Sequence, residues 1–161
     1  MIQGHLESQT SAPLLIVGSF ANKYGMQLNR KYAAGNIIFT GGIYDSEKLN
    51  ALRFFSNIYF HGHSVGGTNP SLLEAMAASA LVCAHDNVFN RAVLNDDGFY
   101  FKNKYDIAAL LDKKTGKSNF PSFINDNRKK IAEKYSWDKI TSAYETLFMQ
   151  CLDAHEKRRS T

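Results

Sequence analysis

Several features that define other protein classes are scarce in this sequence. Its 161 residues include only 2 cysteines and 3 prolines, and no apolar run approaches the roughly 20 residues that a membrane-spanning helix needs. The N-terminus has neither the basic nor the apolar region of a secretory signal. The sequence therefore excludes a disulfide scaffold and a transmembrane protein. It predicts a cytoplasmic protein whose two thiols, Cys83 and Cys151, are reduced and packed.

The composition is otherwise that of an ordinary folded domain. Hydrophobic residues make up 44% of the chain and aromatic residues 12%, which argues against disorder and low complexity. A chain of this length buries about two-thirds of its unfolded surface around one core. We therefore expect a single domain over residues 1–161, with a disordered tail at 156–161.

The net charge of +4 is concentrated in the last third of the chain. Of the 19 lysines and arginines, 13 lie in residues 102–161, where 8 acidic residues accompany them. Such a region could contact nucleic acid or an anionic membrane surface. A solvated helix face is the commoner outcome, and it is the one expected here.

Short apolar runs alternate with helical stretches along the first two-thirds of the sequence. The runs are continuously apolar, as strands buried on both faces of a parallel sheet are, and the spacing between them leaves room for a crossover helix. This pattern predicts an α/β fold with a Rossmann-like, doubly wound parallel sheet and helices on both faces. The expected strands are 14–18, 36–42, 58–64, 81–85 and 99–101.

Helix signals lie between and after these runs. Asp45 and Asn69 are suitable N-cap residues, and Pro70 suits the first turn of a helix. From about Tyr105 onward the pattern is wholly helical. The terminal helices are therefore expected to pack back on the sheet. Their aromatic residues are expected in the core: Tyr135, Trp137, Tyr144 and Phe148.

The segment between the third run and the next helix carries the chemistry. In open parallel sheets, ligands bind beyond the carboxyl ends of the strands, where helix N-termini present free N–H groups. Gly66 and Gly67 allow close backbone approach. Thr68 and Asn69 offer polar side chains, and the helix near Pro70 supplies amides. The segment can thus cradle a phosphate or a sugar, although two glycines before a helix fit a tight turn equally well.

The order of the motifs resembles a known enzyme family. The stretch GGTNPSLLEAMAAS, a strand that ends in AHDN, and FNRAVLNDDGFYF are similar to the C-terminal, nucleotide-sugar-binding domain of GT-B glycosyltransferases of the large retaining family four. HGHSVGGTNPSLLEAM and GGIYDSEKLNALR are similar to bacterial rhamnosyltransferases that build cell-surface polysaccharides. The resemblance covers residues 1–150 and implies a domain that binds a sugar-nucleotide donor.

The resemblance also implies roles for individual residues. The family's glutamate before Ala-Met falls on Glu74, which would accept hydrogen bonds from the donor ribose. The amides of 67–69 would face the sugar and the diphosphate, and Gly42 and Ile43 would hold the nucleobase. Family members usually carry a second glutamate where this sequence has Gly66. The contacts to the sugar ring are therefore expected to differ, in a way that would suit a deoxysugar.

The chain lacks parts that the family has. A strand, and a loop with a basic residue that contacts the diphosphate, should precede the helix that Ile2–Ser8 resembles. An acceptor-binding domain should precede both. Residues 1–161 are therefore interpreted as a truncated donor-binding domain. By itself such a chain is expected to show no glycosyl transfer, because two domains must close to exclude water from the cleft.

Two histidines lie at the end of the third run. His61 and His63 share one face of a strand, as a metal site would require, but no Cys, Asp or Glu neighbours them in the sequence. Neither a metal nor a cofactor is therefore expected. His61 and Ser64 are expected to line the donor site, and His63 to pack. For Arg91, a phosphate contact and an ordinary surface role are equally compatible with the sequence.

The predicted function is donor binding in a retaining, metal-independent glycosyltransferase, which would transfer rhamnose or a similar hexose to a growing cell-surface polysaccharide. Its partners would be the sugar nucleotide and a polysaccharide or lipid-linked acceptor, with a peripheral membrane contact and no nucleic acid. The alternative is a non-catalytic nucleotide- or phosphosugar-binding module of the same fold, since fold alone does not separate the two. A dinucleotide oxidoreductase is disfavoured because Ser19–Lys23, after LLIVG, contains no G-x-G-x-x-G motif.

Overall fold

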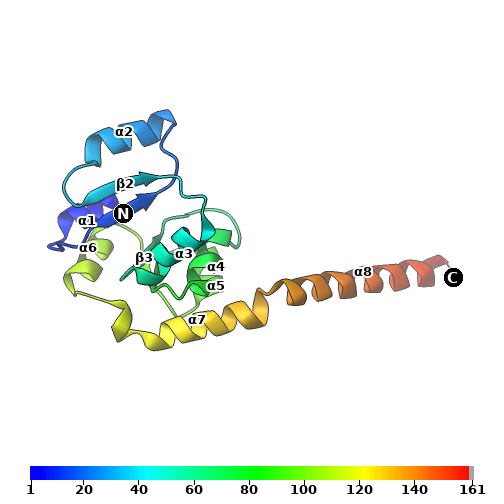
Figure 1. The fold of residues 1–161 in the computed structure, drawn as a ribbon. Coiled ribbons are helices and arrows are strands. Elements are labelled where there is room, and N and C mark those ends of the chain that lie inside the picture. Colours follow the sequence, from blue (N-terminus) through cyan, green and yellow to red (C-terminus); the bar gives the residue numbers. More distant parts are fainter. Residues whose placement is uncertain (160–161) are drawn as a thin grey trace.

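The computed structural model describes residues 1–159, except the side chains at positions 156, 157 and 159. Helices and short strands alternate along most of the chain (Figure 1). The α-helices are α1 (Ile2–Glu7), α2 (Lys23–Tyr32), α3 (Ser46–Phe55), α4 (Pro70–Ala77), α5 (Val88–Leu94), α6 (Lys104–Asp112), α7 (Pro121–Lys134) and α8 (Trp137–Arg159). The strands are β1 (Leu14–Val17), β2 (Ile37–Gly41), β3 (Tyr59–His61), β4 (Val82–His85) and β5 (Phe99–Phe101), and the short 3-10 helix η1 (Lys117–Asn119) precedes α7.

All strand pairs in the structure are parallel. β1 pairs with β2, and Leu14 lies opposite Ile37. β4 lies between β3 and β5, so that Cys83 is opposite Phe60 on one side and Phe99 on the other. The predicted α/β fold with parallel strands and helices on both sides is therefore confirmed.

The five strands form two ladders and not one continuous sheet. The ladders are β1-β2 and β3-β4-β5, and no described strand pairs with the outer edge of β1 or of β3. Leu15, Val17 and Ile38, on one face of β1 and β2, remain 38–46% exposed. The apolar runs correctly located the strands, but such runs carry no information about which strands become neighbours.

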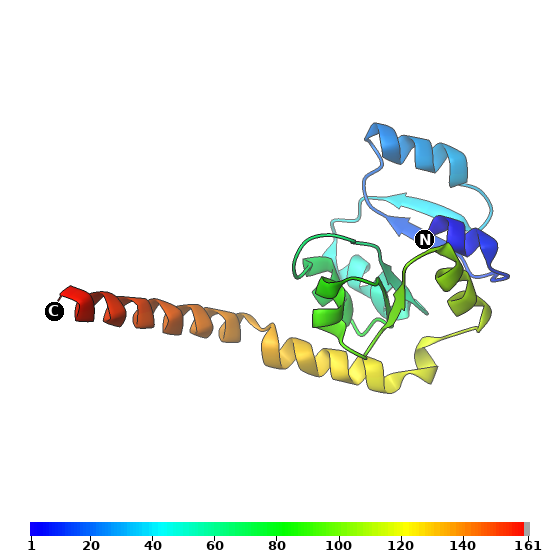
Figure 2. The same ribbon diagram turned by 180° about the vertical axis from the view of Figure 1, so that it is seen from behind.

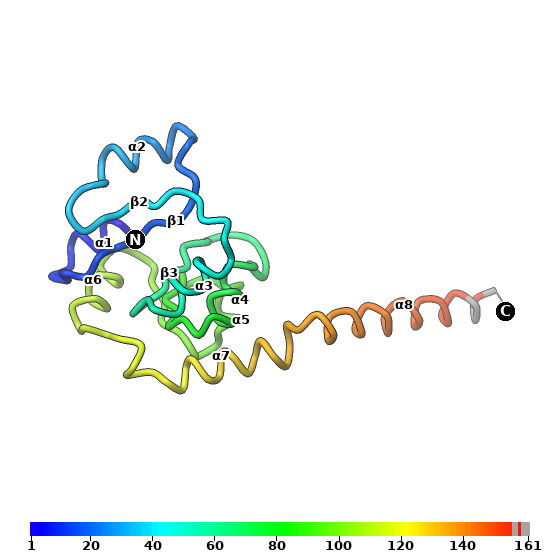
Figure 3. Tube along the Cα trace, viewed as in Figure 1, coloured from blue at the N-terminus to red at the C-terminus, as the bar shows by residue number. Residues whose placement is uncertain are grey.

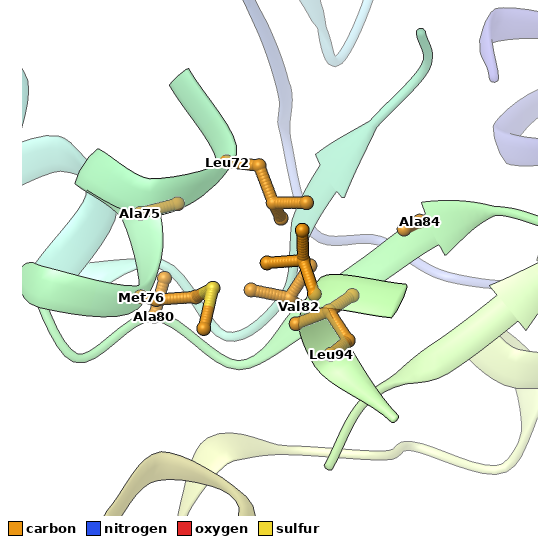
Figure 4. Close-up of a cluster of buried hydrophobic side chains, with 8 residues drawn as sticks. Leu72, Ala75, Met76, Ala80, Val82, Ala84 and Leu94 are labelled. Atoms are coloured by element: carbon orange, nitrogen blue, oxygen red, sulfur yellow. The ribbon is translucent and has the colours of Figure 1, made fainter. Parts of the chain in front are cut away.

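The main core lies between α4, β4 and α5. Figure 4 shows the side chains of α4 and α5 converging on those of β4. The other face of β4 is also covered, because Cys83 packs with Phe101 and Ile107. Burial on both faces explains the continuously apolar run of β4. The packing of α4 on β4 also holds in place the start of α4, where the preceding loop ends. The cluster consists of Leu72, Ala75, Met76, Ala80, Val82, Ala84, Val93 and Leu94.

Helices α1 and α6 are in close contact at a glycine. A Cβ placed on Gly4 would lie 2.7 Å from both the Cβ of Ile107 and the carbonyl oxygen of Lys104. Lys104 also forms an ion pair with Glu7, with 2.5 Å between Nζ and Oε1. This position requires glycine for space, because the backbones approach too closely for a side chain.

Gly4→Ala is expected to lower the free energy of unfolding by about 1–3 kcal/mol, the usual cost of overpacking a tight contact. Urea unfolding followed by circular dichroism measures the change. Gly116→Ala is the matched control, because a Cβ there would lie no closer than 3.6 Å to its nearest neighbour, Asn119 Oδ1. Equal unfolding midpoints for the two variants would contradict the close α1–α6 contact.

The last two helices differ in their packing. α7 contacts the main core through Ile131 and through Tyr135 at its C-terminal cap, as predicted. α8 instead projects away from the rest of the molecule (Figures 2 and 3). Its aromatic residues were predicted in the core, and this was wrong: Trp137 is 79% exposed, and Tyr144 and Phe148 are exposed as well. Their helical spacing indicates an apolar helix face, but the structure places no other element against that face within the described residues.

Two further expectations concern α8. The helix continues to Arg159 and so covers the first part of the range 156–161, predicted as a disordered tail; positions 160–161 lie outside the described residues. Cys151 is exposed on α8 and not packed, whereas Cys83 is buried as predicted and burial raises its pKa to about 12. None of the described helices is both long enough and apolar enough to cross a membrane.

Candidate functional site

The loop between β3 and α4 lies at the carboxyl end of the three-stranded ladder. Residues 62–68 are exposed, and Gly66 adopts a φ of +100°, a conformation that favours glycine. A Cβ on Gly66 or Gly67 would meet no atom within 4 Å. The structure thus places Ser64, Gly66, Gly67 and Thr68 in one exposed loop whose backbone a ligand can approach closely.

The side chain of Asn69 caps α4. Its Oδ1 accepts hydrogen bonds from the backbone N of Ser71, at 3.0 Å, and from Ser71 Oγ, at 2.8 Å. Its carbonyl oxygen accepts from the amides of Leu72 and Leu73. The first-turn amides that the sequence offered to an anion are therefore already used. An anion would meet the loop amides before the cap and the positive end of the helix dipole.

Glu74, on α4, is held by an ion pair with Arg53 of the adjacent helix α3. Nη2 of Arg53 lies 2.6 Å from Oε2 of Glu74. The side chain of Arg53 is only 7% exposed, whereas that of Glu74 is 53% exposed. The carboxylate therefore has one oxygen fixed from inside the protein while about half of the side chain faces solvent, where a ligand could reach it.

Arg53 was not predicted as a site residue. It belongs to GGIYDSEKLNALR, where a helix was expected after Asp45 but only Gly42 and Ile43 were expected to contact a ligand. Besides Glu74, it donates from Nη1 to Oδ1 of Asn50 at 3.0 Å, and its buried Nε has no hydrogen-bond partner among the described residues. The spacing of Leu49, Leu52 and Arg53 puts the arginine beside the apolar face of α3, and this was the signal that could have found it.

The burial of the two histidines is the reverse of what the sequence predicts. His61 was expected to line the donor site, but it is only 1% exposed, whereas His63 is exposed. Their rings stack with centroids 4.8 Å apart, which confirms that they share one face. Burial, with a smaller effect of His63, lowers the pKa of His61 to about 4, so its imidazole is neutral at pH 7. Its buried Nε2 has no hydrogen-bond partner within the described part of the chain.

Two asparagines at the start of α5 fix the backbone of this loop. Asn87 and Asn90 both donate from Nδ2 to the carbonyl oxygen of His63, at 3.0 and 3.1 Å. Asn90 also donates to the carbonyl oxygen of His85 at 2.8 Å. Asn87 was not predicted as a site residue, because its contact with the carbonyl of His63 joins residues 24 positions apart in the sequence. These bonds join the ends of β3 and β4 and anchor the site loop.

The loop after β2, expected to hold a nucleobase, belongs to the other ladder. Gly42 is exposed, Ile43 is half-buried, and the ring of Tyr44 lies against Gly42. The side chain of Asp45 then caps α3 by accepting from the amides of Glu47 and Lys48. This loop leads into α3. Arg53 of α3 pairs with Glu74 of α4, the helix that follows the glycine loop.

A shallow groove of about 430 Å³ runs between α3 and α4 and has Glu74 in its wall. The groove extends toward the C-terminal ends of both helices, past Phe54, Phe55 and Ala77. Glu74 therefore lies between this groove and the glycine loop that begins α4. This groove does not lie at the carboxyl ends of the strands, where the sequence predicts the ligand.

Neither Arg91 nor the histidines form a further charged site. The guanidinium of Arg91 is paired with Asp86 and lies over the ring of Tyr100, 4.2 Å from its centroid. These contacts account for Arg91 without a phosphate. No cluster of three or more metal-binding side chains occurs among the described residues.

This chain is similar to known proteins in its structure. No protein-family model and no curated sequence matches the chain. WaaG, a glycosyltransferase involved in lipopolysaccharide biosynthesis, is similar over 83% of this chain and 38% of its own, with a TM-score of 0.64 and 17% identity. TarM is similar over 91% of this chain and 31% of its own, with a TM-score of 0.68 and 20% identity. The chain thus spans less than two-fifths of either neighbour, and it has a glycosyltransferase-like α/β fold.

Proposed function

We propose that this chain is the donor-binding domain of a glycosyltransferase. Its ligand is a nucleoside diphosphate sugar, bound at the carboxyl ends of the strands. The observation that carries the proposal is Glu74: a half-exposed carboxylate, one turn below an exposed glycine loop, with one oxygen held by a buried arginine. A carboxylate in this position suits the two hydroxyls of a ribose, because its oxygens accept both.

The same geometry supports a role for the loop in the reaction. Transfer of the sugar leaves negative charge on the departing nucleoside diphosphate. In this proposal, the backbone amides at Gly67 and Thr68, together with the dipole of α4, stabilise that charge without a metal ion. Gly42 and Ile43 hold the nucleobase from the other ladder.

The resemblance in the sequence supports the finer proposals. The sugar is rhamnose or a similar hexose, because glycine replaces a carboxylate at position 66. The reaction retains the anomeric configuration, and the acceptor is a polysaccharide or a lipid-linked sugar at the inner membrane face. An acceptor-binding domain outside residues 1–161 supplies the other wall of the cleft, so the isolated chain binds donor without turnover.

Gly66→Ala is expected to weaken nucleotide binding at least fivefold. An L side chain is strained at a φ of +100°, so the loop must move away from the position in which its amides meet the diphosphate. The measurement is calorimetric titration of the 161-residue chain with UDP-, GDP- and dTDP-sugars. At least one of these is expected to bind the wild type with a Kd of about 1 mM or tighter, the usual range for enzyme substrates.

Gly35→Ala is the matched control. Gly35 also has a positive φ, of +59°, and no atom lies within 4 Å of a Cβ built there, but it is in the turn between α2 and β2. Both variants are therefore expected to lose stability, with only Gly66→Ala losing affinity. The proposal is wrong if no sugar nucleotide binds the wild type, or if both variants bind as tightly as it does.

A further inference from the structure

We infer that Arg53 is a positioning residue for the ribose contact: it holds Glu74 in the orientation that meets the hydroxyls of the donor. The inference rests on the proposed function, because it takes Glu74 as the ribose acceptor. Neither the motifs nor the resemblance assigned Arg53 a role. What points to it is the pairing of a buried guanidinium with a half-exposed carboxylate across two helices.

The arginine is itself held rigidly. Its side chain is 7% exposed, and Nη1 is fixed by Asn50, one turn earlier on α3. From there Nη2 reaches Oε2 of Glu74 at 2.6 Å. A buried and oriented donor therefore sets the position of one carboxylate oxygen.

The need for such a donor follows from the exposure of Glu74. A glutamate that is 53% exposed on a helix can sample several rotamers, and a ligand would have to restrict them on binding. A fixed partner restricts them beforehand, so less binding free energy is lost to ordering. Arg53 is suited to this task because its planar guanidinium has several donors in a fixed geometry, whereas a lysine ammonium is a flexible point charge.

The pair also links the two parts of the proposed site. Arg53 lies on α3, which follows the expected nucleobase loop, and Glu74 lies on α4, which follows the glycine loop. A displacement of α3 would therefore be transmitted to Glu74 through the ion pair. The ribose lies between base and diphosphate in a nucleotide, and the pair joins the two helices that follow the loops proposed to hold these groups.

The test compares the affinity of the full chain for uridine and guanosine diphosphates with its affinity for their 2′,3′-dideoxy analogues. The ratio of the two affinities measures recognition of the ribose hydroxyls. Arg53→Met is expected to lower this ratio about tenfold, which corresponds to the loss of one hydrogen bond to a charged group. A purely structural arginine would lower stability, or both affinities equally, and leave the ratio unchanged.

Lys130→Met is the matched control. Lys130 is also a largely buried cation, at 14% exposure, and it is paired with Asp97 at 2.6 Å, between α7 and the turn after α5. Its replacement is expected to lower stability and leave the ratio intact. Arg53→Lys is a milder variant for use if Arg53→Met does not fold, and it is expected to lose part of the preference.

The outcomes separate the two proposals. If Glu74→Gln removes the ribose preference while the folded Arg53 variants keep it in full, Arg53 does not position Glu74 and the inference is overturned, but the proposed function stands. If the wild type shows no ribose preference, the assignment of Glu74 fails and the inference fails with it. Loss of the preference in the Arg53 variants, but not in Lys130→Met, supports both.

Discussion

Replacement of Glu74 by alanine is expected to lower both the stability of the fold and its affinity for a nucleoside diphosphate. The variant leaves the guanidinium of Arg53 buried without its carboxylate. Loss of one partner from a fully buried pair costs about 3–5 kcal/mol, and the half-exposure of Glu74 places the expected loss nearer 2 kcal/mol. The lost acceptors should weaken binding by about one to two decades.

Glu74→Gln separates these two effects. The glutamine amide keeps one oxygen, which can accept a hydrogen bond from Arg53. Its nitrogen is a donor, so the amide cannot accept from both ribose hydroxyls as a carboxylate can. Asp97→Asn is the control, because it neutralises the acid of another ion pair away from the site. Thermal unfolding and nucleotide titration of the three variants give both quantities. Unchanged affinity in Glu74→Gln would count against the ribose assignment, and unchanged stability in Glu74→Ala would count against a buried, charged Arg53.

His61 is expected to make the stability of this protein depend on pH between about 6.5 and 4. Its pKa is lowered from 6.5 to about 4 by burial, so the unfolded chain takes up a proton at a higher pH than the folded protein does. The free energy of unfolding is therefore highest above pH 6.5 and falls as the pH drops toward 4. The full difference corresponds to about 3 kcal/mol for one proton.

The measurement is urea unfolding at a series of pH values for the wild type and for His61→Leu, which cannot titrate. The variant is expected to lose this part of the pH dependence. His155→Leu, at an exposed position on α8, is the control and is expected to keep the wild-type profile. Parallel profiles for the wild type and His61→Leu would show that folding does not lower the pKa of His61.

Local sequence patterns were sufficient for the strands and for the site loop. The apolar runs located all five strands to within a few residues, because burial on both faces leaves a continuous signal, as in Val82–His85. The glycine loop was located because Gly66 and the Asn69 cap act within a few residues of their own positions. Such features depend on local backbone geometry, which the sequence encodes directly.

Features that depend on partners distant in the sequence were not predicted. The ion pair of Arg53 and Glu74 joins residues 21 positions apart, and the asparagine bonds to the carbonyl of His63 span 24 and 27. The burial of His61 depends on the elements that surround the end of β3. His61 and His63 share one face of the strand, so alternation along the strand does not indicate which of the two is buried. The exposure of α8 was not predicted for the same reason. An apolar helix face indicates that another surface should pack against it, but the pattern does not identify that surface.

The projection of α8 has a hydrodynamic consequence. Its 23 residues extend about 34 Å at the rise of an α-helix, whereas a compact body of the size of the remaining chain has a radius of gyration of about 14 Å. An 18.1 kDa chain with this outline has a larger Stokes radius than a sphere of the same mass. The monomer should therefore elute early from a sizing column, and an early peak must be checked by light scattering before it is taken for a dimer.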